Sequence, residues 1–595
     1  MASIVDTTQG NPGTFSPVTQ VTKWVGGPGT GKTYTLLKFI EYERDQHGTD
    51  LKDIRFMSYS RSQMLDVRNR IKEIYPDSNE KDRERHVKTI HGTALYSLIR
   101  SKNIVTSQEL GDGKEDTVIQ EGTQTWAFMD FCKLYGLQYN PKLGKVTEDE
   151  DDILIRGNLP NGNAFFSVNN YLAANMWPYT SWPYAVHEMG IKIDKRTIDT
   201  ALFHKWEEYK HSRKLWEHED YCKLALEVRP RLTGSVLLID EFQDVSPSHN
   251  ALYEMWRDQG TFDQIYLAGD DNQSIYGFRG ANPEYIQNTP ANLSGAWGGS
   301  VPVSHRCPSQ VVQLADQVLR GTSNMVPRED GGTVEWVRKQ TTPVVLDHIL
   351  DLHRTYGKVM VLSRFRSHVQ KWHELLDSNG IPHTSRSGKY FTWDKVIPER
   401  DGRPQNKREV GDLLGFLYAM DKYQTQGGPW TVPKKYALAL SAVLSVPEPN
   451  RKRTDSYLNH LKPGLPVSIP DLLTDKMGLP EDLTPYDLIT HMQFKGRYDP
   501  QIKKRLNTAV SNGRYIMPGS IEVDTIHSVK GLESPAVVID CSFNVDRVMD
   551  AKANPEEERR VGYVAVTRSS NHVSLIEPIH GPWNPVIEPV RGLWK

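Results

Sequence analysis

The chain has 595 residues, of which 38% are hydrophobic and 25% are charged, and its formal net charge is −2. A chain of this length exceeds what one hydrophobic core can organise, so several domains are expected, and any surface that binds nucleic acid must be a local basic stripe. No run of about 18 apolar residues predicts a membrane span, and no basic and apolar leader predicts secretion.

The cysteines are few and far apart: Cys132, Cys222, Cys307 and Cys541. No CxxC pair predicts a cysteine-based zinc or iron–sulfur site, and this usage fits a reduced intracellular compartment. We therefore expect a cytoplasmic protein.

In chain order, a loose segment rich in Gly, Pro, Thr and Ser (residues 1–20) precedes a series of short apolar runs. Runs of four to six such residues, each followed by a loop or helix signal, are typical of strands buried on both faces of a parallel sheet. They form one group before about residue 300 and a second after about residue 358. The runs are Val21–Val25, Ile54–Tyr59, Val236–Ile239, Ile265–Ala268, Val359–Leu362, Ile521–Ile526, Ala536–Ile539 and Val573–Ile576.

Two long stretches, 101–214 and 421–518, lack this rhythm. The sequence thus predicts an α/β protein with two cores, each interrupted by a mostly helical insertion. The second insertion carries 14 Lys and Arg against 9 Asp and Glu, a net charge of +5. Binding to a phosphate backbone and ordinary solvated helix faces both explain this excess.

A glycine-rich loop lies between the first apolar run and a helical stretch, which is the strand–loop–helix setting of a Walker A motif. Its glycines let backbone N–H groups wrap phosphates, helped by the helix N-terminus. Lys32 would neutralise the β- and γ-phosphates, and the Thr33 hydroxyl would bind Mg²⁺. The whole loop is expected to bind the nucleotide: Gly26, Gly27, Pro28, Gly29, Thr30, Gly31, Lys32 and Thr33.

The run Val236–Ile239 ends in Asp240 and Glu241, an apolar strand followed by two carboxylates, as in a Walker B motif. Asp240 would hold Mg²⁺, and Glu241 would position and polarise the attacking water. Together the two motifs predict a P-loop ATPase that hydrolyses ATP, with ATP and Mg²⁺ as its cofactors.

The most specific string follows about thirty residues later. The box Asp240-Glu241-Phe242-Gln243-Asp244 together with the segment 269–281, GDDNQSIYGFRGA, resembles UvrD/Rep helicases of superfamily 1. The resemblance implies that Gln273 senses the γ-phosphate, that Tyr276 and Phe278 stack on bases, and that Arg279 contacts the strand. Stacking tolerates any base and is worth about 1–3 kcal/mol per base. Packing in the core is the competing explanation for both aromatics.

Further motifs appear in the family's order. Ser58-Tyr59-Ser60-Arg61 resembles motif Ia and Thr89-Ile90-His91-Gly92 resembles motif Ib, which implies strand contacts by Tyr59, Thr89 and His91. Ser304-His305-Arg306-Cys307 stands where the family has Asn-Tyr-Arg-Ser. Arg306 would be an arginine finger, and His305 would replace the ring that stacks on adenine. Arg364, after Val361-Leu362-Ser363, is a candidate strand contact.

Segment 525–533, TIHSVKGLE, resembles motif V, and segment 559–568, RRVGYVAVTR, resembles motif VI. By this resemblance Thr525 and His527 contact the strand backbone, Glu533 contacts the nucleotide sugar, and Arg568 is the second arginine finger. The family's adenine-reading glutamine has no clear counterpart; Gln9 lies at about the right distance, and Gln20 is close to the P-loop. A strand-separating hairpin is placed near 542–556.

The resemblance implies two RecA-like P-loop cores. The first (1A) is expected to comprise residues 1–100 and 215–301, and the second (2A) residues 302–420 and 519–595, with insertions 1B at 101–214 and 2B at 421–518. It also implies an ATP-dependent translocase and helicase with 3′→5′ polarity that binds single-stranded DNA and its junctions with duplex. The second insertion lacks a Gly-Ile-Gly segment for duplex contact, so the need for a protein partner stays open. The alternative is a DNA-stimulated ATPase that strips proteins or signals to a partner nuclease.

Overall fold

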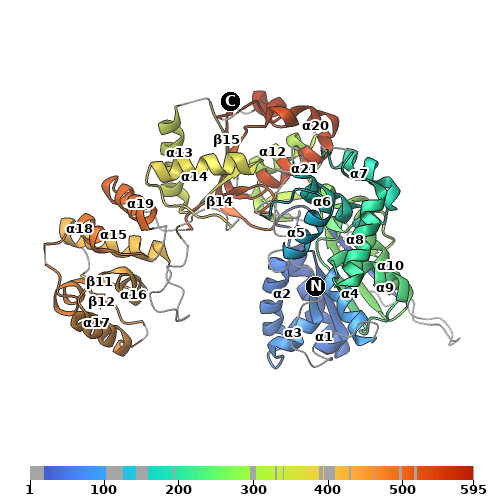
Figure 1. The fold of residues 1–595 in the computed structure, drawn as a ribbon, viewed down its shortest axis with the longest axis horizontal. Coiled ribbons are helices and arrows are strands. Elements are labelled where there is room, and N and C mark those ends of the chain that lie inside the picture. The colour runs from blue at the N-terminus through green and yellow to red at the C-terminus, as the bar shows by residue number, and fades with distance from the viewer. Residues whose placement is uncertain are drawn as a thin grey trace. The chain divides into compact units, whose positions relative to one another are not determined.

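The computed structural model describes residues 19–101, 125–141, 159–291, 303–386 and 409–593, with gaps of one to four residues inside these ranges, together with Leu293, Ser294 and Trp393. The chain divides into two compact units. Their helices and strands are labelled in Figure 1. The first contains residues 1–332 and 549–567, and the second contains residues 333–548 and 568–595. The predicted boundaries differ from this division, because segments 302–332 and 549–567 pack with the first unit. The assignment of four domains stays a prediction.

The first unit is built on a parallel six-stranded sheet with the order β3-β2-β4-β5-β1-β6. Strands β1 and β2 follow each other in the chain but are not neighbours in the sheet, because the connections between parallel strands are crossovers. The strands are β1 (Gln20–Val25), β2 (Ile54–Ser58), β3 (Val87–Thr89), β4 (Val236–Ile239), β5 (Gln264–Gly269) and β6 (Leu293–Ser294). Four of the predicted apolar runs are therefore strands of this sheet.

Alternate residues of the strands point into two separate hydrophobic cores, one on each face of the sheet. On one face Phe56 and Leu238 pack with α1 (Lys32–His47) and α2 (Arg61–Ile74). On the other, Met57 and Leu237 pack with α4 (Ile90–Arg100), α9 (His218–Val228) and α10 (Pro247–Asp258). Helices on both faces explain why these strands are continuously apolar in sequence. Helices α3 (Glu80–His86) and α11 (Glu284–Asn288) also belong to the first unit.

The first insertion has its own core, rich in aromatic side chains. It is formed by α5 (Thr125–Leu134), α6 (Asn161–Ala174), α7 (Trp182–Glu188) and α8 (Thr200–Ser212). Phe131 packs edge-on against Trp206, with ring centroids 4.9 Å apart. The described residues of this insertion are mostly helical, as predicted.

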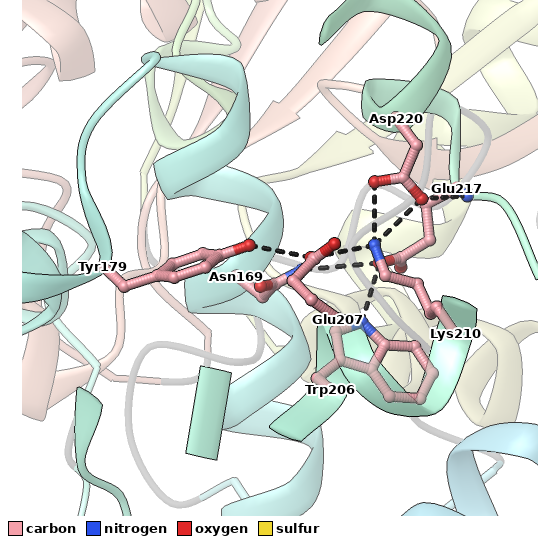
Figure 2. Close-up of polar contacts among 7 residues, drawn as sticks. All are labelled: Asn169, Tyr179, Trp206, Glu207, Lys210, Glu217 and Asp220. Atoms are coloured by element: carbon pink, nitrogen blue, oxygen red, sulfur yellow. Dashed lines mark hydrogen bonds and ion pairs between the residues drawn. The ribbon is translucent and has the colours of Figure 1, made fainter. Parts of the chain in front are cut away.

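A buried ionic cluster joins this insertion to the core helix α9 (Figure 2). The Lys210 ammonium is surrounded by three carboxylates, 3.0 Å from Glu207, 3.2 Å from Glu217 and 2.7 Å from Asp220. The Glu217 carboxylate also accepts hydrogen bonds from the Trp206 indole at 2.8 Å and the Asn169 amide at 3.4 Å. Because Lys210 and Glu217 are almost completely buried, each charge depends on the others for compensation.

The segments after residue 302 that belong to the first unit are β7 (Val303–Pro308), α12 (Ser309–Leu319), β8 (Val326–Arg328) and α21 (Pro555–Val566). Helices α12 and α21 pack against each other.

Near the predicted hairpin, residues 545–547 form a short 3-10 helix that leads into α20 (Val548–Ala553). The hairpin prediction is wrong, because these residues satisfy their backbone groups as helical turns.

The second unit contains a parallel five-stranded sheet with the order β13-β10-β14-β15-β9. Its core on one face is formed with α13 (Thr342–Tyr356) and α14 (Arg366–Ser378). The strands are β9 (Thr333–Val337), β10 (Val359–Ser363), β13 (Ile521–Thr525), β14 (Ser534–Asp540) and β15 (Ser569–Ile576). The predicted α/β class with two parallel sheets flanked by helices is confirmed.

A separate hydrophobic cluster in the second unit contains the basic insertion. Helix α15 (Val410–Gln426), most of which precedes the predicted insertion, packs into this cluster with Leu413 and Phe416. The other elements are α16 (Lys434–Val443), α17 (Glu448–His460), α18 (Pro485–His491), α19 (Asp499–Ser511), a π-helical turn (Asp471–Lys476), and the paired strands β11 (Thr431–Val432) and β12 (Val467–Ser468). Among the described residues, no helix is both long and apolar enough to cross a membrane.

Candidate nucleotide site and nucleic-acid contacts

The glycine-rich loop connects β1 to α1 as predicted. Gly29 and Gly31 adopt positive φ angles of 73° and 79°, which favour glycine. A Cβ atom on Gly29 would lie 2.5 Å from Cβ of Arg306 and 2.8 Å from Oγ of Ser304, so this position also has no room for a side chain. The buried Lys32 ammonium donates to the carbonyls of Gly26 and Gly27 at 3.0 and 3.1 Å. The loop thus concentrates one positive charge and several backbone N–H groups at a helix N-terminus, which suits a polyphosphate.

Two acidic side chains follow β4, next to this loop. Oδ2 of Asp240 accepts a hydrogen bond from the Thr33 hydroxyl at 2.6 Å, so the two predicted metal ligands are in contact. Burial, and then the charge of Glu241, raises the pKa of Asp240 to about 6. A hydroxyl and a carboxylate placed together are oxygen donors that fit Mg²⁺, and a bound cation would favour the ionised carboxylate.

Glu241 adopts a left-handed backbone conformation, with φ of 54°, which is uncommon for a residue other than glycine. Its carboxylate is held by two amides: Gln63 donates to Oε1 at 3.0 Å, and Gln243 donates to Oε2. The Ser58 hydroxyl donates in turn to the Gln63 carbonyl at 3.1 Å. A strained backbone and two amide donors fix this carboxylate in one orientation.

The hydrogen bonds continue from Glu241 to a second buried acid. The backbone N–H of Asp270 donates to Oε1 of Gln243 at 2.9 Å, and Oδ2 of Asp270 accepts from Nε2 of Gln273 at 2.8 Å. The hydroxyl of Tyr563 also lies 3.2 Å from this oxygen. Burial raises the pKa of Asp270 to about 6. Gln273, the predicted γ-phosphate sensor, is therefore connected through Asp270 and Gln243 to the carboxylate of Glu241.

Sequence reasoning missed four of these residues. Gln243, Asp270 and Tyr563 stand inside the strings that carried the family resemblance, so a signal for them was available. Gln63 lies on α2, five residues after Ser58, and only the fold brings it to Glu241.

The two predicted arginine fingers have different surroundings. Arg306 lies two residues after Ser304, whose hydroxyl donates to the Pro28 carbonyl at 2.7 Å. Between them, the N–H of His305 donates to the Gly29 carbonyl at 2.8 Å. Arg306 and the exposed His305 are thus in the same unit as the P-loop and directly beside it.

Arg568, in contrast, is the first residue of the second unit's final segment. It is buried and donates to the Leu532 carbonyl at 3.2 Å. Glu533, the predicted sugar contact, follows Leu532 and is exposed. Gln9 lies outside the described residues.

The aromatic residues predicted to contact the strand come together in the first unit. Tyr59 and Tyr276 stack with centroids 5.4 Å apart, and Phe278 packs edge-on against Tyr276 at 6.2 Å. The Arg279 guanidinium lies 5.1 Å from the centroid of Tyr276 and 5.4 Å from that of Phe278. Tyr276 and Phe278 are largely buried, 8% and 7% exposed, so they cover each other in this structure. A base could stack on them only after these rings separate.

The motif Ib residues have structural partners. The Thr89 hydroxyl caps α4 by accepting from the N–H of Gly92 at 3.1 Å. Nε2 of His91 lies 3.1 Å from both Oε1 of Glu219 and Nε2 of His249. Both side chains thus have structural partners within the first unit, and their predicted contacts with the strand stay a prediction.

In the second unit the predicted contacts follow two neighbouring strands. β10 and β13 pair in parallel with Ser363 opposite Thr525, so Arg364 and His527 both lie beyond the carboxyl ends of these strands. Ligands of open α/β sheets bind at this edge. Arg364, Thr525 and His527 are buried, and the Thr525 hydroxyl accepts from the N–H of Ser528 at 3.3 Å.

Comparison with known proteins agrees with this architecture. The family model described as UvrD/REP helicase N-terminal domain matches residues 8–157 and 184–293, and the UvrD-like helicase C-terminal domain matches residues 520–576. Together they match more than half of the chain.

Relatives are similar at low identity. The chain is 24% identical to the YjcD protein of Bacillus subtilis (strain 168) over 457 residues, 63% of this chain and 57% of that protein. It is 22% identical to the ATP-dependent DNA helicase UvrD2 of Mycobacterium tuberculosis (strain ATCC 25618 / H37Rv) over 365 residues, 57% of this chain and 46% of that protein. It is 20% identical to the ATP-dependent DNA helicase PcrA of Leuconostoc citreum over an alignment, gaps included, of 623 positions, which covers 93% of this chain and 79% of that protein. The chain thus spans about half the length of the first two relatives. With two family models matching in chain order around a P-loop core, the chain belongs to the UvrD/Rep-like helicases of superfamily 1.

Proposed function

We propose that this protein is an ATP-dependent translocase on single-stranded DNA that unwinds duplex DNA with 3′→5′ polarity. The observation that carries the proposal is the arrangement of Lys32, Thr33, Asp240 and Glu241 in the first unit, with Glu241 held by two amides. A site built only to bind a nucleotide does not require a second, oriented carboxylate.

The side chains divide the work of hydrolysis. Lys32 and the loop N–H groups bind the phosphates, and Thr33 and Asp240 hold Mg²⁺. Glu241 orients the attacking water and polarises it, which is the positioning that phosphoryl transfer mainly needs. Arg306, beside the P-loop, supplies positive charge to the transferred phosphoryl group; an arginine finger is worth roughly 10³–10⁵ in rate. Arg568 keeps the role of second arginine finger that the family resemblance implies.

We assign the coupling of ATP hydrolysis to DNA movement to the segment between Gln273, at the nucleotide site, and the aromatic group proposed to contact the strand. Gln273 is hydrogen-bonded to Asp270, and three residues later Tyr276 begins the aromatic group formed with Tyr59 and Phe278. A change in the hydrogen bonds of Gln273 on ATP binding would pass along this short segment. We assign strand contacts to Tyr59, Thr89, His91, Tyr276, Phe278, Arg279, Arg364, Thr525 and His527, and nucleotide contacts to His305, Glu533 and Gln9.

The first test is ATP hydrolysis with and without single-stranded DNA, followed by unwinding of duplexes with a 3′ or a 5′ tail. Strong stimulation, abolished in Glu241→Gln and retained in Glu227→Gln, supports the proposal when unwinding starts only from the 3′ tail. Glu227 is a matched control because it is an exposed glutamate of α9. Absence of stimulation contradicts the proposal, and stimulation without unwinding restricts it to a translocase that strips proteins or an ATPase that signals to a partner.

A further inference from the structure

A cluster of side chains of the types that ligate metal ions lies in the second unit, apart from every residue assigned above. It contains Glu335 of the edge strand β9, His348 of α13, and His572 and Ser574 of the neighbouring strand β15. Strands β9 and β15 pair in parallel with Glu335 opposite Ser574, which places these two side chains on the same face of the sheet. Helix α13 brings His348 to them.

Four donor atoms converge in this cluster. Oε1 of Glu335 lies 2.9 Å from Nε2 of His348, 3.0 Å from Nε2 of His572 and 2.9 Å from Oγ of Ser574. Oγ of Ser574 lies 2.8 Å from each of the two histidine nitrogens. Five of the six separations among the four atoms are therefore between 2.8 and 3.0 Å.

Hydrogen bonds alone cannot account for all of these short contacts. With both histidines neutral and protonated on Nε2, the two N–H groups and the serine hydroxyl supply three hydrogens for five short contacts. A metal ion serves all four atoms at once. For Zn²⁺, with bonds of about 2.0–2.2 Å, tetrahedral ligands lie roughly 3.3–3.5 Å apart, so each separation would need to widen by only about half an ångström.

The surroundings agree with a metal site. The His572 side chain is 6% exposed, whereas His348 is 20% and Glu335 is 40% exposed. An ion can therefore reach the cluster from solvent past Glu335 and His348, while His572 is fixed by the surrounding protein. Nδ1 of His572 lies 3.5 Å from the hydroxyl of Tyr356, a partner of the kind that fixes a ligating imidazole through its second nitrogen. Two imidazoles with one carboxylate suit Zn²⁺ and its neighbours among divalent transition metals.

We propose that Glu335, His348 and His572 bind a divalent transition-metal ion of the Zn²⁺ class, with Ser574 or a water in the fourth position. The ion would fasten α13 and the edge strand β9 to β15. These strands follow the two places, after residues 332 and 567, at which the chain enters the second unit. The site would thus stabilise the segments that connect this unit to the rest of the chain, and it is independent of the proposed motor function.

The test is metal binding by the untagged, full-length protein after dialysis against a chelator. Co²⁺ is titrated in while its visible absorption is followed, and Zn²⁺ is then used to displace it. We expect one equivalent bound at micromolar concentration, and affinity lower by more than about 100-fold in Glu335→Gln and His348→Gln, since loss of even an outer partner costs 10–100-fold. His353→Gln, a half-buried histidine on the same helix, is the matched control and should bind as the wild type does.

A second histidine group provides an internal check. His91, Cys222 and His249 of the first unit also place their ligand atoms within 4.8 Å of one another. Loss of the Co²⁺ absorption in His249→Gln but not in His348→Gln would overturn the proposal, as would binding only at millimolar concentration. If the β-sheet variants fail to fold, diethylpyrocarbonate labelling of the wild type decides. Zn²⁺ should protect the partly exposed His348 by at least tenfold, and equal labelling of His348 with and without Zn²⁺ refutes the site.

Discussion

Gln63 offers the sharpest test of how the catalytic carboxylate is positioned. In Gln63→Ala the hydrogen bond of 3.0 Å to Oε1 of Glu241 is lost, while the bond from Gln243 to the other oxygen remains. A hydrogen bond to a charged group contributes about 1.5–3 kcal/mol. If that energy serves to orient Glu241 in the transition state, kcat falls by about 10- to 100-fold, because each 1.36 kcal/mol is tenfold in rate.

The assay is steady-state ATP hydrolysis at saturating single-stranded DNA. KM for ATP should change little, since Gln63 acts on Glu241, whose proposed role is to orient the attacking water and not to bind the phosphates. Asn69→Ala is the matched control, an exposed amide on the same helix α2. A kcat within twofold of the wild type, in a variant with unchanged thermal stability, would refute the positioning role.

Three further predictions concern the fold and the nucleotide loop. Lys210→Met should lower the free energy of unfolding by about 3–5 kcal/mol, because it leaves the buried Glu217 without its cation. Denaturant titration measures this change, and unchanged stability would contradict the role of the cluster in Figure 2. Gly29→Ala should abolish binding of a fluorescent ATP analogue, since its Cβ would meet Arg306 at 2.5 Å at a φ of 73°, whereas Gly48→Ala, with a positive φ and open space, should bind normally. The pKa of Asp270 is about 6 in the folded chain against 3.8 ordinarily, so the folded state keeps this proton up to a higher pH than the unfolded state does. The free energy of unfolding that this group contributes therefore falls as pH rises from about 4 to about 6. In Asp270→Asn the melting temperature should depend less on pH across that range. If it changes with pH as steeply as in the wild type, Asp270 does not titrate there.

The parallel sheets and the nucleotide loop could be predicted because they depend on local patterns. The run Val236–Ile239 is apolar at every position since helices cover both faces of the sheet, and its end at Asp240 is fixed by the transition to polar residues. The loop from Gly26 to Thr33 is similarly determined by its glycines and the helix that follows.

Other features depend on contacts between distant segments, which no local pattern encodes. Gln63 reaches Glu241 across 178 positions in sequence. The segment around Arg306 was expected to face the P-loop from the second core, but its backbone hydrogen bonds place it in the first unit. Tyr276 and Phe278 are buried where Tyr276 stacks on Tyr59 and Phe278 packs edge-on against Tyr276, whereas the sequence alone left base stacking and core packing open.

The most direct test of the central claim is translocation on single-stranded DNA of increasing length, followed by stopped-flow fluorescence with a dye at one end. A motor that moves 3′→5′ reaches a 5′ dye after a lag that grows in proportion to length, and Glu241→Gln shows no such signal. A lag that is independent of length, or one that grows only with a 3′ dye, would contradict the account.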